Sequence, residues 1–368
     1  MSKKVAIVHD WLTVNGGAEK VLSSLLNIYP KADIYVIVDF LNDKDREDIL
    51  NSKKTKQSFI QKLPFAKKYF RHYLPLFPYA IEQFDLSEYD LVISASYAVS
   101  KGVMTHPSQT HICYSHSPIR YAWDMYHTYI KEHNIKGLKG VFIKYILHKI
   151  RIWDVVSSNR VDYFISNSLL VKKRIKKFYR RDAKVIYPPV DTDKFTFCGD
   201  KENFYLTASR LVPYKKTKLI VEVFNRLGKD LVVIGDGEEL EEIKKIAKKN
   251  IKVLGYQKDE VLIDYMQRAK AFIYGALEDF GIVPVEAMAC GTPVICYEKG
   301  GTSESVKHLI TGVHFKKQSV DEIIKAIELF EEKYDSFNLK EISNYAKSFS
   351  KERFENEIKG YIKEVWNQ

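Results

Sequence analysis

The sequence predicts an α/β protein with two doubly wound domains, each a mostly parallel sheet flanked by helices, and three observations support this fold class. The chain has 368 residues, a length that suits two domains of about 150 to 190 residues each. In both halves, short apolar runs of strand type alternate with segments long enough for crossover helices. A rigid segment with two adjacent prolines, residues 185–191, separates the two series.

The first half begins with a strand, a glycine-containing loop and a helix, which is the order found in nucleotide-binding folds. The strand covers residues 5–9, the loop covers residues 10–15, and Gly16 and Gly17 open a segment of helical periodicity. The spacing of the later apolar runs predicts crossover connections and therefore parallel pairing. Four further strands are expected, at residues 33–38, 91–95, 111–114 and 163–167.

The second half repeats this pattern, with a helix at residues 238–249 whose apolar side chains fall on one face. Five strands are expected, at residues 204–208, 231–235, 251–254, 271–274 and 293–296. Two domains follow, residues 1–188 and 189–350, with a terminal amphipathic helix, residues 351–368, packing back toward the first domain. Because ligands of parallel sheets bind at the carboxyl ends of the strands, we expect a cleft where these ends of the two sheets meet.

The composition is that of a globular protein, with 45% hydrophobic and 29% charged residues. No signal peptide is recognisable after Met1, and no apolar run reaches the roughly 18 to 20 residues needed to cross a membrane. We therefore expect a cytoplasmic protein. The four cysteines show no metal-ligand spacing and are expected to be reduced thiols.

Positive charge is concentrated in the first half of the chain. Residues 1–190 carry 30 Lys and Arg against 17 Asp and Glu, a net charge of +13, whereas the remainder carries −2. One basic segment, residues 53–71, is interleaved with aromatic side chains, as in proteins that lie on anionic membrane surfaces, although a solvated helix face has a similar composition. Its expected membrane-contact residues are Lys53, Lys54, Phe59, Lys62, Phe65, Lys67, Lys68, Phe70 and Arg71. No recognised nucleic-acid-binding motif accompanies the charge, so nucleic acid is not expected as a partner.

The most informative motif is a pair of glutamates eight positions apart. Glu278 would lie in the loop after the strand at residues 271–274, and Glu286 would lie in the first turn of a helix that contains Pro284. Both carboxylates would then flank the free backbone N–H groups of a helix amino terminus, which bind phosphate. Acidic residues are also common in first helical turns for structural reasons. The glutamate pair alone therefore does not indicate a function, and it has to be interpreted together with the other motifs of the sequence.

Cations and a histidine are expected at the same sheet edges. Arg210 and Lys215 follow the first strand of the second domain, at the edge that carries the two glutamates, where they could neutralise a pyrophosphate leaving group. His116 follows a strand of the first domain, with Arg120 and Asp124 shortly after it. A lone histidine or cation is more often structural, but their shared position at strand ends favours function.

With these motifs the sequence resembles the retaining glycosyltransferases of family 4, which have the GT-B fold of two facing Rossmann-like domains. The resemblance covers nearly the whole chain, and its most specific parts are Ser-Arg-Leu-Val-Pro-Tyr-Lys at residues 209–215 and the glutamate pair followed by Gly-Thr-Pro-Val. It is greatest to the bacterial subgroup that builds O-antigen, capsule and other surface polysaccharides, including lipopolysaccharide mannosyltransferases. Departures occur at Gly300, Gly301 and Lys216, outside the residues of the core chemistry.

The resemblance implies that residues 189–350 bind the nucleotide-sugar donor. Arg210 and Lys215 are expected to hold the diphosphate, and Glu286 the ribose hydroxyls. Carboxylates suit vicinal hydroxyls and cations suit phosphate oxygens, so the chemistry agrees. The hydroxyls of the transferred sugar are expected to contact Glu278 and the backbone of Phe280 and Gly281, and Ile282 is expected to be a further donor-binding residue.

By the same resemblance, residues 1–188 bind the acceptor. His116 is expected near the reaction centre, so that His116, Arg210, Lys215 and Glu278 are the expected catalytic residues. Gly16 and Gly17 are expected close to the donor phosphates, and Arg120 and Asp124 are candidate acceptor contacts.

The implied reaction transfers a hexose from a nucleotide diphosphate sugar, with retention at the anomeric carbon, to a saccharide linked to a lipid diphosphate. The departing phosphate would itself accept the proton of the acceptor hydroxyl, so no protein nucleophile is needed. No metal and no cofactor are expected, because the cations stabilise the leaving group. Two Asp-x-Asp sequences, at residues 43–45 and 191–193, lie in a polar loop and at the linker and are not expected to bind metal.

GDP-mannose is the preferred donor by resemblance, with a UDP-sugar as the alternative. The expected location is the inner face of the cytoplasmic membrane, with the anionic membrane surface and other enzymes of polysaccharide assembly as candidate partners. A sugar-nucleotide epimerase of the same fold and a non-catalytic binding protein remain as alternatives. The epimerase would react with the donor alone, whereas the binding protein would bind no nucleotide diphosphate.

Overall fold

The computed structural model describes residues 3–132 and 134–366, which form two compact units. The first unit contains residues 1–187 and 354–368, and the second contains residues 188–353. The chain thus passes between the units at the Tyr187–Pro188 bond, inside the proline-containing segment, and again near the start of the last helix. The sequence-based boundaries, 188/189 and 350/351, lie within three residues of these positions.

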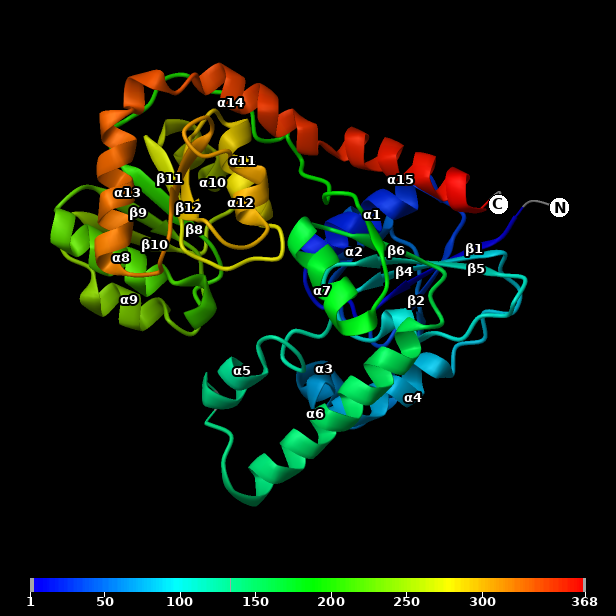
Figure 1. The fold of residues 1–368 in the computed structure, drawn as a ribbon. Helices are drawn as coiled ribbons and strands as arrows, with labels where there is room; N and C mark the ends of the chain where they lie inside the picture. The colour runs from blue at the N-terminus through cyan, green and yellow to red at the C-terminus, as the bar shows by residue number, and fades with distance from the viewer. Residues whose placement is uncertain (1–2, 133, 367–368) are drawn as a thin grey trace. The chain divides into compact units, whose positions relative to one another are not determined.

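The first unit is built on a parallel sheet of seven strands in the order β3-β2-β1-β4-β5-β6-β7 (Figure 1). The strands are β1 Val5–His9, β2 Asp33–Val36, β3 Lys56–Gln57, β4 Leu91–Ser96, β5 Thr110–Ser115, β6 Tyr163–Ser166 and β7 Ala183–Val185. The α-helices are α1 Gly17–Ile28, α2 Asp43–Leu50, α3 Ala66–Tyr69, α4 Phe77–Glu82, α5 Tyr126–Glu132, α6 Gly137–Ser158, α7 Leu169–Tyr179 and most of α15 Lys351–Trp366. Short 3₁₀ helices are η1 Phe59–Lys62, η2 Phe70–Leu76 and η3 Ser100–Gly102.

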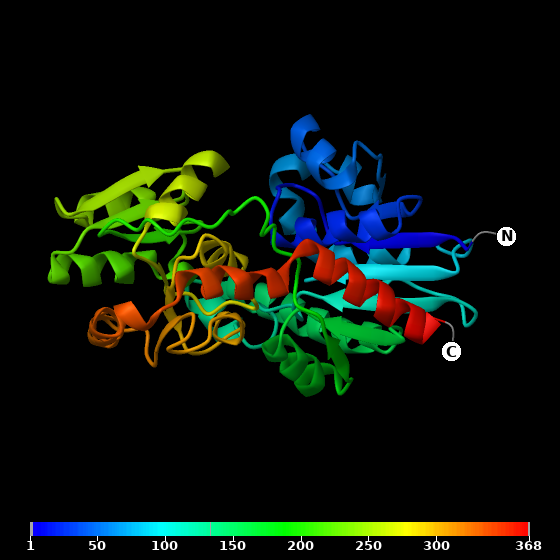
Figure 2. The same cartoon turned by 90° about the horizontal axis from the view of Figure 1, so that it is seen from above.

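Apolar side chains cover both faces of this sheet, as expected for parallel strands whose side chains are buried on each side. On one face Ile7 and Ile93 pack with Leu22 of α1 and with Phe354 and Ile358 of α15. The view from above in Figure 2 shows this part of α15 beside the strands of the first unit. On the other face the central strands pack against η1, η2 and α4.

The second unit is also built on a parallel sheet, of six strands in the order β10-β9-β8-β11-β12-β13. The strands are β8 Tyr205–Ala208, β9 Leu231–Ile234, β10 Ile251–Gly255, β11 Ala271–Tyr274, β12 Val294–Tyr297 and β13 Gly312–Phe315. The α-helices are α8 Thr217–Leu227, α9 Leu240–Ile246, α10 Asp259–Arg268, α11 Ile282–Ala289, α12 Thr302–Ser305, α13 Val320–Glu332 and α14 Leu339–Ala346. The 3₁₀ helices are η4 Pro213–Lys215, η5 Tyr334–Ser336 and η6 Lys347–Phe349.

The predicted α/β fold with two parallel sheets is confirmed. Each expected strand is present within two residues of its expected ends, and three more, β3, β7 and β13, extend the sheets at their edges. The helix expected at residues 238–249 is shorter, because α9 ends at Ile246. In the described part of the chain, no helix combines the length and apolar character needed to cross a bilayer.

Strand order reverses once in each sheet, and in doubly wound sheets this reversal is the usual ligand-binding position. In the first unit β1 has β2 on one side and β4 on the other, so the switch point lies between β1 and β4. In the second unit the corresponding point lies between β8 and β11. Ligands of doubly wound sheets bind outside the carboxyl ends of the strands at these points.

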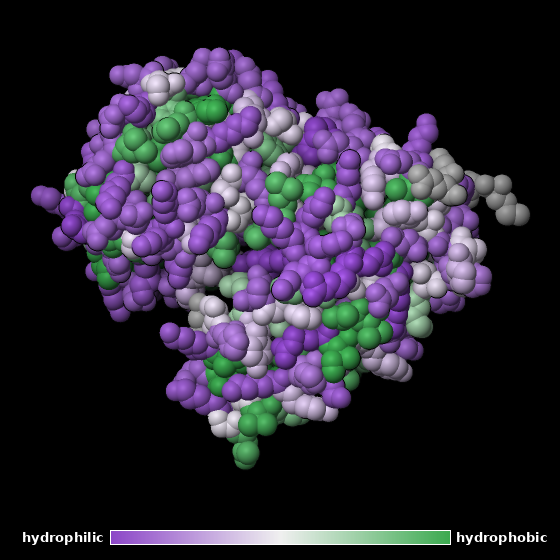
Figure 3. Space-filling view, viewed as in Figure 1, coloured by the Kyte–Doolittle hydropathy of each residue, from purple (hydrophilic) through white to green (hydrophobic). Residues whose placement is uncertain are grey.

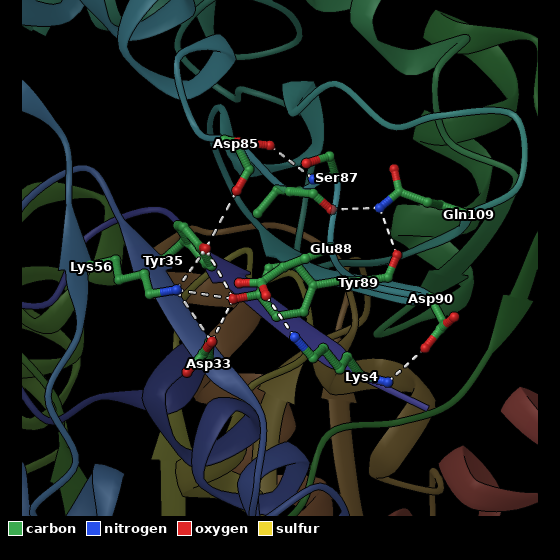
Figure 4. Close-up of polar contacts among 11 residues, drawn as sticks. Lys4, Asp33, Tyr35, Lys56, Asp85, Ser87, Glu88, Tyr89, Asp90 and Gln109 are labelled. Carbon is green, nitrogen blue, oxygen red and sulfur yellow. Dashed lines mark hydrogen bonds and ion pairs between the residues drawn. The ribbon is translucent and has the colours of Figure 1, made fainter. Parts of the chain in front are cut away.

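The opposite, amino-terminal edge of the first sheet carries a polar cluster with a structural role (Figure 4). Lys56, at the start of β3, donates hydrogen bonds to Asp33 at 3.2 Å and to the hydroxyl of Tyr35 at 3.0 Å, and Tyr89 also donates to Asp33. The hydrogen bond from Tyr89 and the contact with Lys56 hold the pKa of Asp33 below its ordinary value, against the effect of burial. These bonds tie the amino ends of β2 and β3 to the chain before β4, at the edge away from the ligand-binding ends.

Candidate functional site

An ion pair bridges the switch point of the second unit. Lys215 lies in the segment after β8, and Glu278 lies in the loop after β11, so the two side chains approach from the two strands that flank this point. The Lys215 ammonium lies 2.5 Å from Glu278 Oε1 and donates to the Tyr274 hydroxyl at 2.8 Å. The side chains of Lys215 and Glu278 are only 14% and 15% exposed. The sheet thus brings together two predicted site residues that are far apart in the sequence.

Lys215 is held in its charged form. Burial alone would lower the pKa of Lys215, but its interactions with Tyr274 and Glu278 outweigh burial and raise it. Burial, together with the nearby Glu278 carboxylate, also raises the pKa of Tyr274, so this phenol stays protonated and can donate to the carboxylate. The site therefore offers a fixed cation and an oriented carboxylate at neutral pH.

Arg210 lies in the same segment as Lys215, directly after Ser209, and is exposed. The backbone here is fixed to the neighbouring β9 loop, because Leu211 N–H donates to the carbonyl of Asp236 at 2.8 Å and Ser209 N–H donates to that of Ile234 at 3.1 Å. An anchored backbone with a solvent-accessible guanidinium suits a group that meets a ligand from solution.

Glu286 occupies a different helical position from the one that the sequence suggested. Helix α11 begins at Ile282, so Glu286 is its fifth residue and lies in the second turn, not in the first. The side chain is 4% exposed. The expectation was wrong because the helix starts directly after Gly281, whose left-handed φ of 89° ends the loop. Phe280, another expected donor contact, is buried with 3% exposure, so only its backbone could meet a ligand.

The loop that carries Glu278 rests on Gly300 and Gly301. Gly301 N–H donates to the carbonyl of Glu278 at 2.8 Å. A Cβ atom on Gly301 would overlap the carbonyl oxygen of Asp279 and the Cα of Phe280. The absence of a side chain at Gly301 therefore sets the position of the 278–280 loop.

Gly301→Ala is expected to displace this loop and to destabilise the protein by about 2 kcal/mol, since overpacking against backbone typically costs 1–3 kcal/mol. Urea denaturation measures the change. The matched control is Gly360→Ala in α15, where a new Cβ meets nothing within 4 Å. That substitution is expected to be neutral or to stabilise by up to about 1 kcal/mol through helix propensity. Equal stability of the two variants would show that the close approach at Gly301 is unimportant.

At the carboxyl edge of the first sheet, His9, Tyr97 and His116 follow or end three neighbouring strands, β1, β4 and β5. The rings of Tyr97 and His116 lie 6.0 Å apart, and those of His9 and Tyr97 lie 5.7 Å apart. Burial, with a smaller contribution from His9, lowers the pKa of His116 to about 3. His116 is therefore neutral at pH 7, and its Nε2 is shielded from solvent without a hydrogen-bond partner among the described residues. A neutral imidazole can bind a hydroxyl but adds no charge.

Two acidic residues, Asp10 and Glu19, organise the loop after β1, and the sequence-based reasoning assigned neither a role. The buried Asp10 carboxylate accepts hydrogen bonds from four successive backbone N–H groups, residues 97–100, at 2.6–2.9 Å. Glu19 accepts from Gly16 N–H at 3.1 Å and lies 3.4 Å from His9 Nε2. The sequence pattern that could have pointed to these two residues is His-Asp at the end of a strand, followed by Gly-Gly-Ala-Glu.

The glycines Gly16 and Gly17 lie at the amino terminus of α1, and their contact with a donor phosphate stays a prediction. Gly16 is the N-cap and Gly17 is exposed. Asp124, in contrast, forms an ion pair at 2.7 Å with Arg174 of α7, which is itself 6% exposed. This pairing gives Asp124 a structural function in fixing its loop, and Arg120 is half-buried in the same loop.

The basic segment proposed for membrane contact is exposed in part. Phe65 is 80% exposed, and most of the lysines of this segment are exposed. Phe70 is 3% exposed and packs in the core with Phe77 and the indole of Trp11, so its assignment to a membrane surface was wrong. In this half-buried segment the ring of Phe70 is directed inward, whereas Phe59, Phe65 and Tyr69 remain exposed.

Among the described residues no three His, Cys, Asp or Glu side chains are arranged to hold a metal ion. Of the two Asp-x-Asp sequences, residues 43–45 lie in the first turn of α2, where Asn42 caps the helix by accepting from Asp45 N–H. The cysteines in the described structure are free thiols.

Solved structures with a similar fold include proteins described as glycosyltransferases. The chain superposes on Anabaena HepE in complex with UDP-glucose with a TM-score of 0.70 and 20% identity, covering 98% of this chain and 100% of that chain. Sucrose-phosphate synthase from Thermosynechococcus elongatus gives a TM-score of 0.72 at 14% identity over 99% of each chain. With the topology above, these likenesses define a protein of the GT-B fold class.

Family comparisons agree along the chain. Residues 15–194 match the family described as Glycosyltransferase Family 4, and residues 192–349 match Glycosyl transferases group 1. Together the two matches cover residues 15–349 and give the chain a pair of glycosyltransferase-type domains.

Curated relatives match over shorter stretches. An uncharacterized glycosyltransferase of Methanocaldococcus jannaschii is 27% identical over 203 residues, which is 54% of this chain and 54% of the relative. A GDP-mannose-dependent alpha-(1-6)-phosphatidylinositol monomannoside mannosyltransferase of Mycobacterium tuberculosis is 32% identical over 171 residues, 38% of this chain and 44% of the relative. The chain therefore spans about half the length of the curated relatives that it matches.

Proposed function

We propose that the protein transfers a hexose, with retention of anomeric configuration, from a nucleotide diphosphate sugar to a saccharide acceptor. The observation that carries this proposal is the Lys215–Glu278 pair at the β8/β11 switch point, where a doubly wound sheet binds its ligand. A cation there stabilises the negative charge that develops on the departing diphosphate, and a carboxylate binds sugar hydroxyls.

In this mechanism Lys215 and Arg210 bind the diphosphate, and the phosphate oxygen that leaves the sugar takes the proton of the acceptor hydroxyl. Glu278 and the backbone of residues 280–282 hold the sugar, and Glu286 holds the ribose. The bond from Tyr274 to Glu278 at 3.3 Å keeps the carboxylate oriented when the donor diphosphate competes for Lys215. His116, neutral at pH 7, would contact a hydroxyl near the reaction centre without adding charge. No protein nucleophile and no metal ion take part.

The donor is proposed to be GDP-mannose, with a UDP-sugar as the second candidate. Relatives named as mannosyltransferases favour the first, including an alpha-1,3/1,6-mannosyltransferase of Candida glabrata that is 25% identical over 201 residues. The likeness to HepE, which was solved with UDP-glucose, supports the second. The base would lie near residues 235–237 and 255–257, where Tyr256 is 74% exposed.

The acceptor is proposed to be a saccharide linked to a lipid diphosphate, used in building bacterial surface polysaccharide. The net charge of +13 in residues 1–190 suits a polyanionic lipid carrier and a position on the inner face of the cytoplasmic membrane. Other enzymes of polysaccharide assembly are proposed as partners at that membrane.

Thermal unfolding in the presence of candidate donors tests the donor assignment. GDP-mannose at 100 times its Kd is expected to stabilise the protein by about 2.7 kcal/mol, which raises Tm by several degrees, whereas UDP-glucose at the same concentration is expected to give a smaller shift. A larger shift with UDP-sugars would transfer the assignment to uracil nucleotides. No shift with any nucleotide diphosphate sugar would contradict the proposed function.

A further inference from the structure

Helix α6 is apolar on two opposite faces, which is unusual for a helix at the surface of a globular unit. Its inner face packs into a cluster in which Leu147 and Ile150 are buried against Ile119 and Ala122. A large exposed apolar patch on a folded unit marks a surface that meets another protein or a membrane. The second face of α6 therefore needs an apolar partner of its own.

The outer face carries an apolar stripe. At 100° per residue, its members fall within about 60° of one direction, and the stripe extends over about 27 Å. These side chains are between 48% and 91% exposed: Leu138, Val141, Phe142, Tyr145, Ile152 and Val156. Figure 3 shows hydrophobic surface in green at the bottom of the view, over the amino end of α6 as labelled in Figure 1.

Cations border this stripe, and no carboxylate interrupts it. Lys139 and Lys144 lie on its two sides, and Lys149 lies within it, 5.4 Å from the ring centroid of Tyr145. The sole acidic residue of α6 is Asp154, which is buried and paired with Lys101. The stripe thus combines aliphatic and aromatic side chains with exposed lysines.

We propose that the outer face of α6 docks the protein onto an anionic lipid bilayer. The apolar side chains would enter the boundary between headgroups and acyl chains, and the lysine stems would extend along them to place the ammonium groups at lipid phosphates. This inference adds the membrane-binding element to the proposed function, in which the acceptor is carried by a lipid, but its test requires no turnover.

The lysines and apolar side chains of the α6 stripe fit a lipid bilayer better than they fit a second copy of the chain or a nucleic acid. A second copy of the chain would bring the same lysines against one another, at a cost that no carboxylate on the stripe could offset. A nucleic acid would match the lysines but would leave Leu138, Val141 and Phe142 without an apolar partner. An anionic bilayer supplies both the acyl chains and the negative phosphates.

Flotation of the full chain with vesicles tests the proposal. Wild-type protein is expected to bind vesicles of phosphatidylcholine containing about one quarter phosphatidylglycerol, and to bind pure phosphatidylcholine more weakly. Leu138→Ser with Phe142→Ser is expected to weaken binding by about tenfold or more, because two exposed apolar side chains are lost. Lys139→Gln with Lys144→Gln is expected to weaken binding by a similar factor, but only on the anionic vesicles and with less effect at high salt.

The matched control is Leu309→Ser with Ile310→Ser, two exposed aliphatic residues of the second unit, which should bind vesicles as wild type does. Phe65→Ser tests the basic segment separately. The proposal is overturned if wild type does not bind anionic vesicles, if the α6 variants bind as wild type does, or if only Phe65→Ser loses binding. It is also overturned if wild type is a dimer that the α6 variants convert to monomers. Donor-induced thermal shifts on the same variants report on the donor site independently.

Discussion

Lys215→Ala is expected to lower kcat for glycosyl transfer by about 100- to 1,000-fold, the usual effect of removing one preorganised group that stabilises developing charge. The Lys215 ammonium is fixed by Tyr274 and Glu278, so it can meet the leaving phosphate without rearrangement. Steady-state kinetics with saturating donor, supported by circular dichroism to verify the fold, measure the loss. Arg210→Ala is expected to act in the same direction.

The control for Lys215→Ala is Lys218→Ala, one turn further along the chain. Lys218 pairs with the exposed Glu242 on α9 and not with Glu278, and its replacement should leave kcat within about twofold, as for most surface ion pairs. Turnover close to wild type in Lys215→Ala or in Arg210→Ala would contradict the leaving-group role of that residue.

Glu278→Gln is expected to lower kcat by about 10- to 100-fold while changing the Kd of the free nucleotide by less than about threefold. The substitution keeps the size of the side chain but removes the charge that holds Lys215 and binds sugar hydroxyls. Because the nucleotide alone carries no hexose, its binding should not depend on this carboxylate. Kinetics give kcat, and calorimetry with free GDP and UDP gives the Kd.

Glu260→Gln, at the exposed start of α10, is the matched control for this variant and should leave both quantities unchanged. If Glu278→Gln weakens nucleotide binding as much as it lowers kcat, the carboxylate acts on the diphosphate through Lys215. Unchanged kinetics would remove Glu278 from the mechanism.

The central strands were predictable because parallel strands buried on both faces leave continuous apolar runs such as residues 5–9 and 91–95. Three of the edge strands, β3, β7 and β13, carried no such signal. Strand β3 is the dipeptide Lys56–Gln57, with both side chains exposed, and β7 contains an exposed lysine between two apolar residues. Their strand conformation comes from hydrogen bonds to a neighbouring strand, which composition does not record.

For the donor site, the sequence predicted which residues share a sheet edge, but not which of them touch. Lys215 and Glu278 are 63 positions apart, and their pairing follows from the placement of β8 beside β11. The position of Glu286 was missed by one turn, since Pro284 suits several places in a first turn and only the left-handed Gly281 fixes the start. The exposed stripe on α6 could not be predicted from the sequence either. An apolar helix has the same sequence pattern whether its faces are buried or exposed to solvent.

The first unit is assembled from two separate stretches of chain, and this affects the order in which the two units can fold during synthesis. Phe354, Ile358 and Ile362 fill one face of its core, yet they are synthesised after the entire second unit. The second unit is continuous in sequence, so it can complete its core while the earlier-made sheet still lacks a helix. Domains usually fold in order from the amino terminus during synthesis. Here the first unit can complete its core only after the second unit has been synthesised. Until α15 emerges, the apolar side chains of α1 and β1 stay accessible to chaperones.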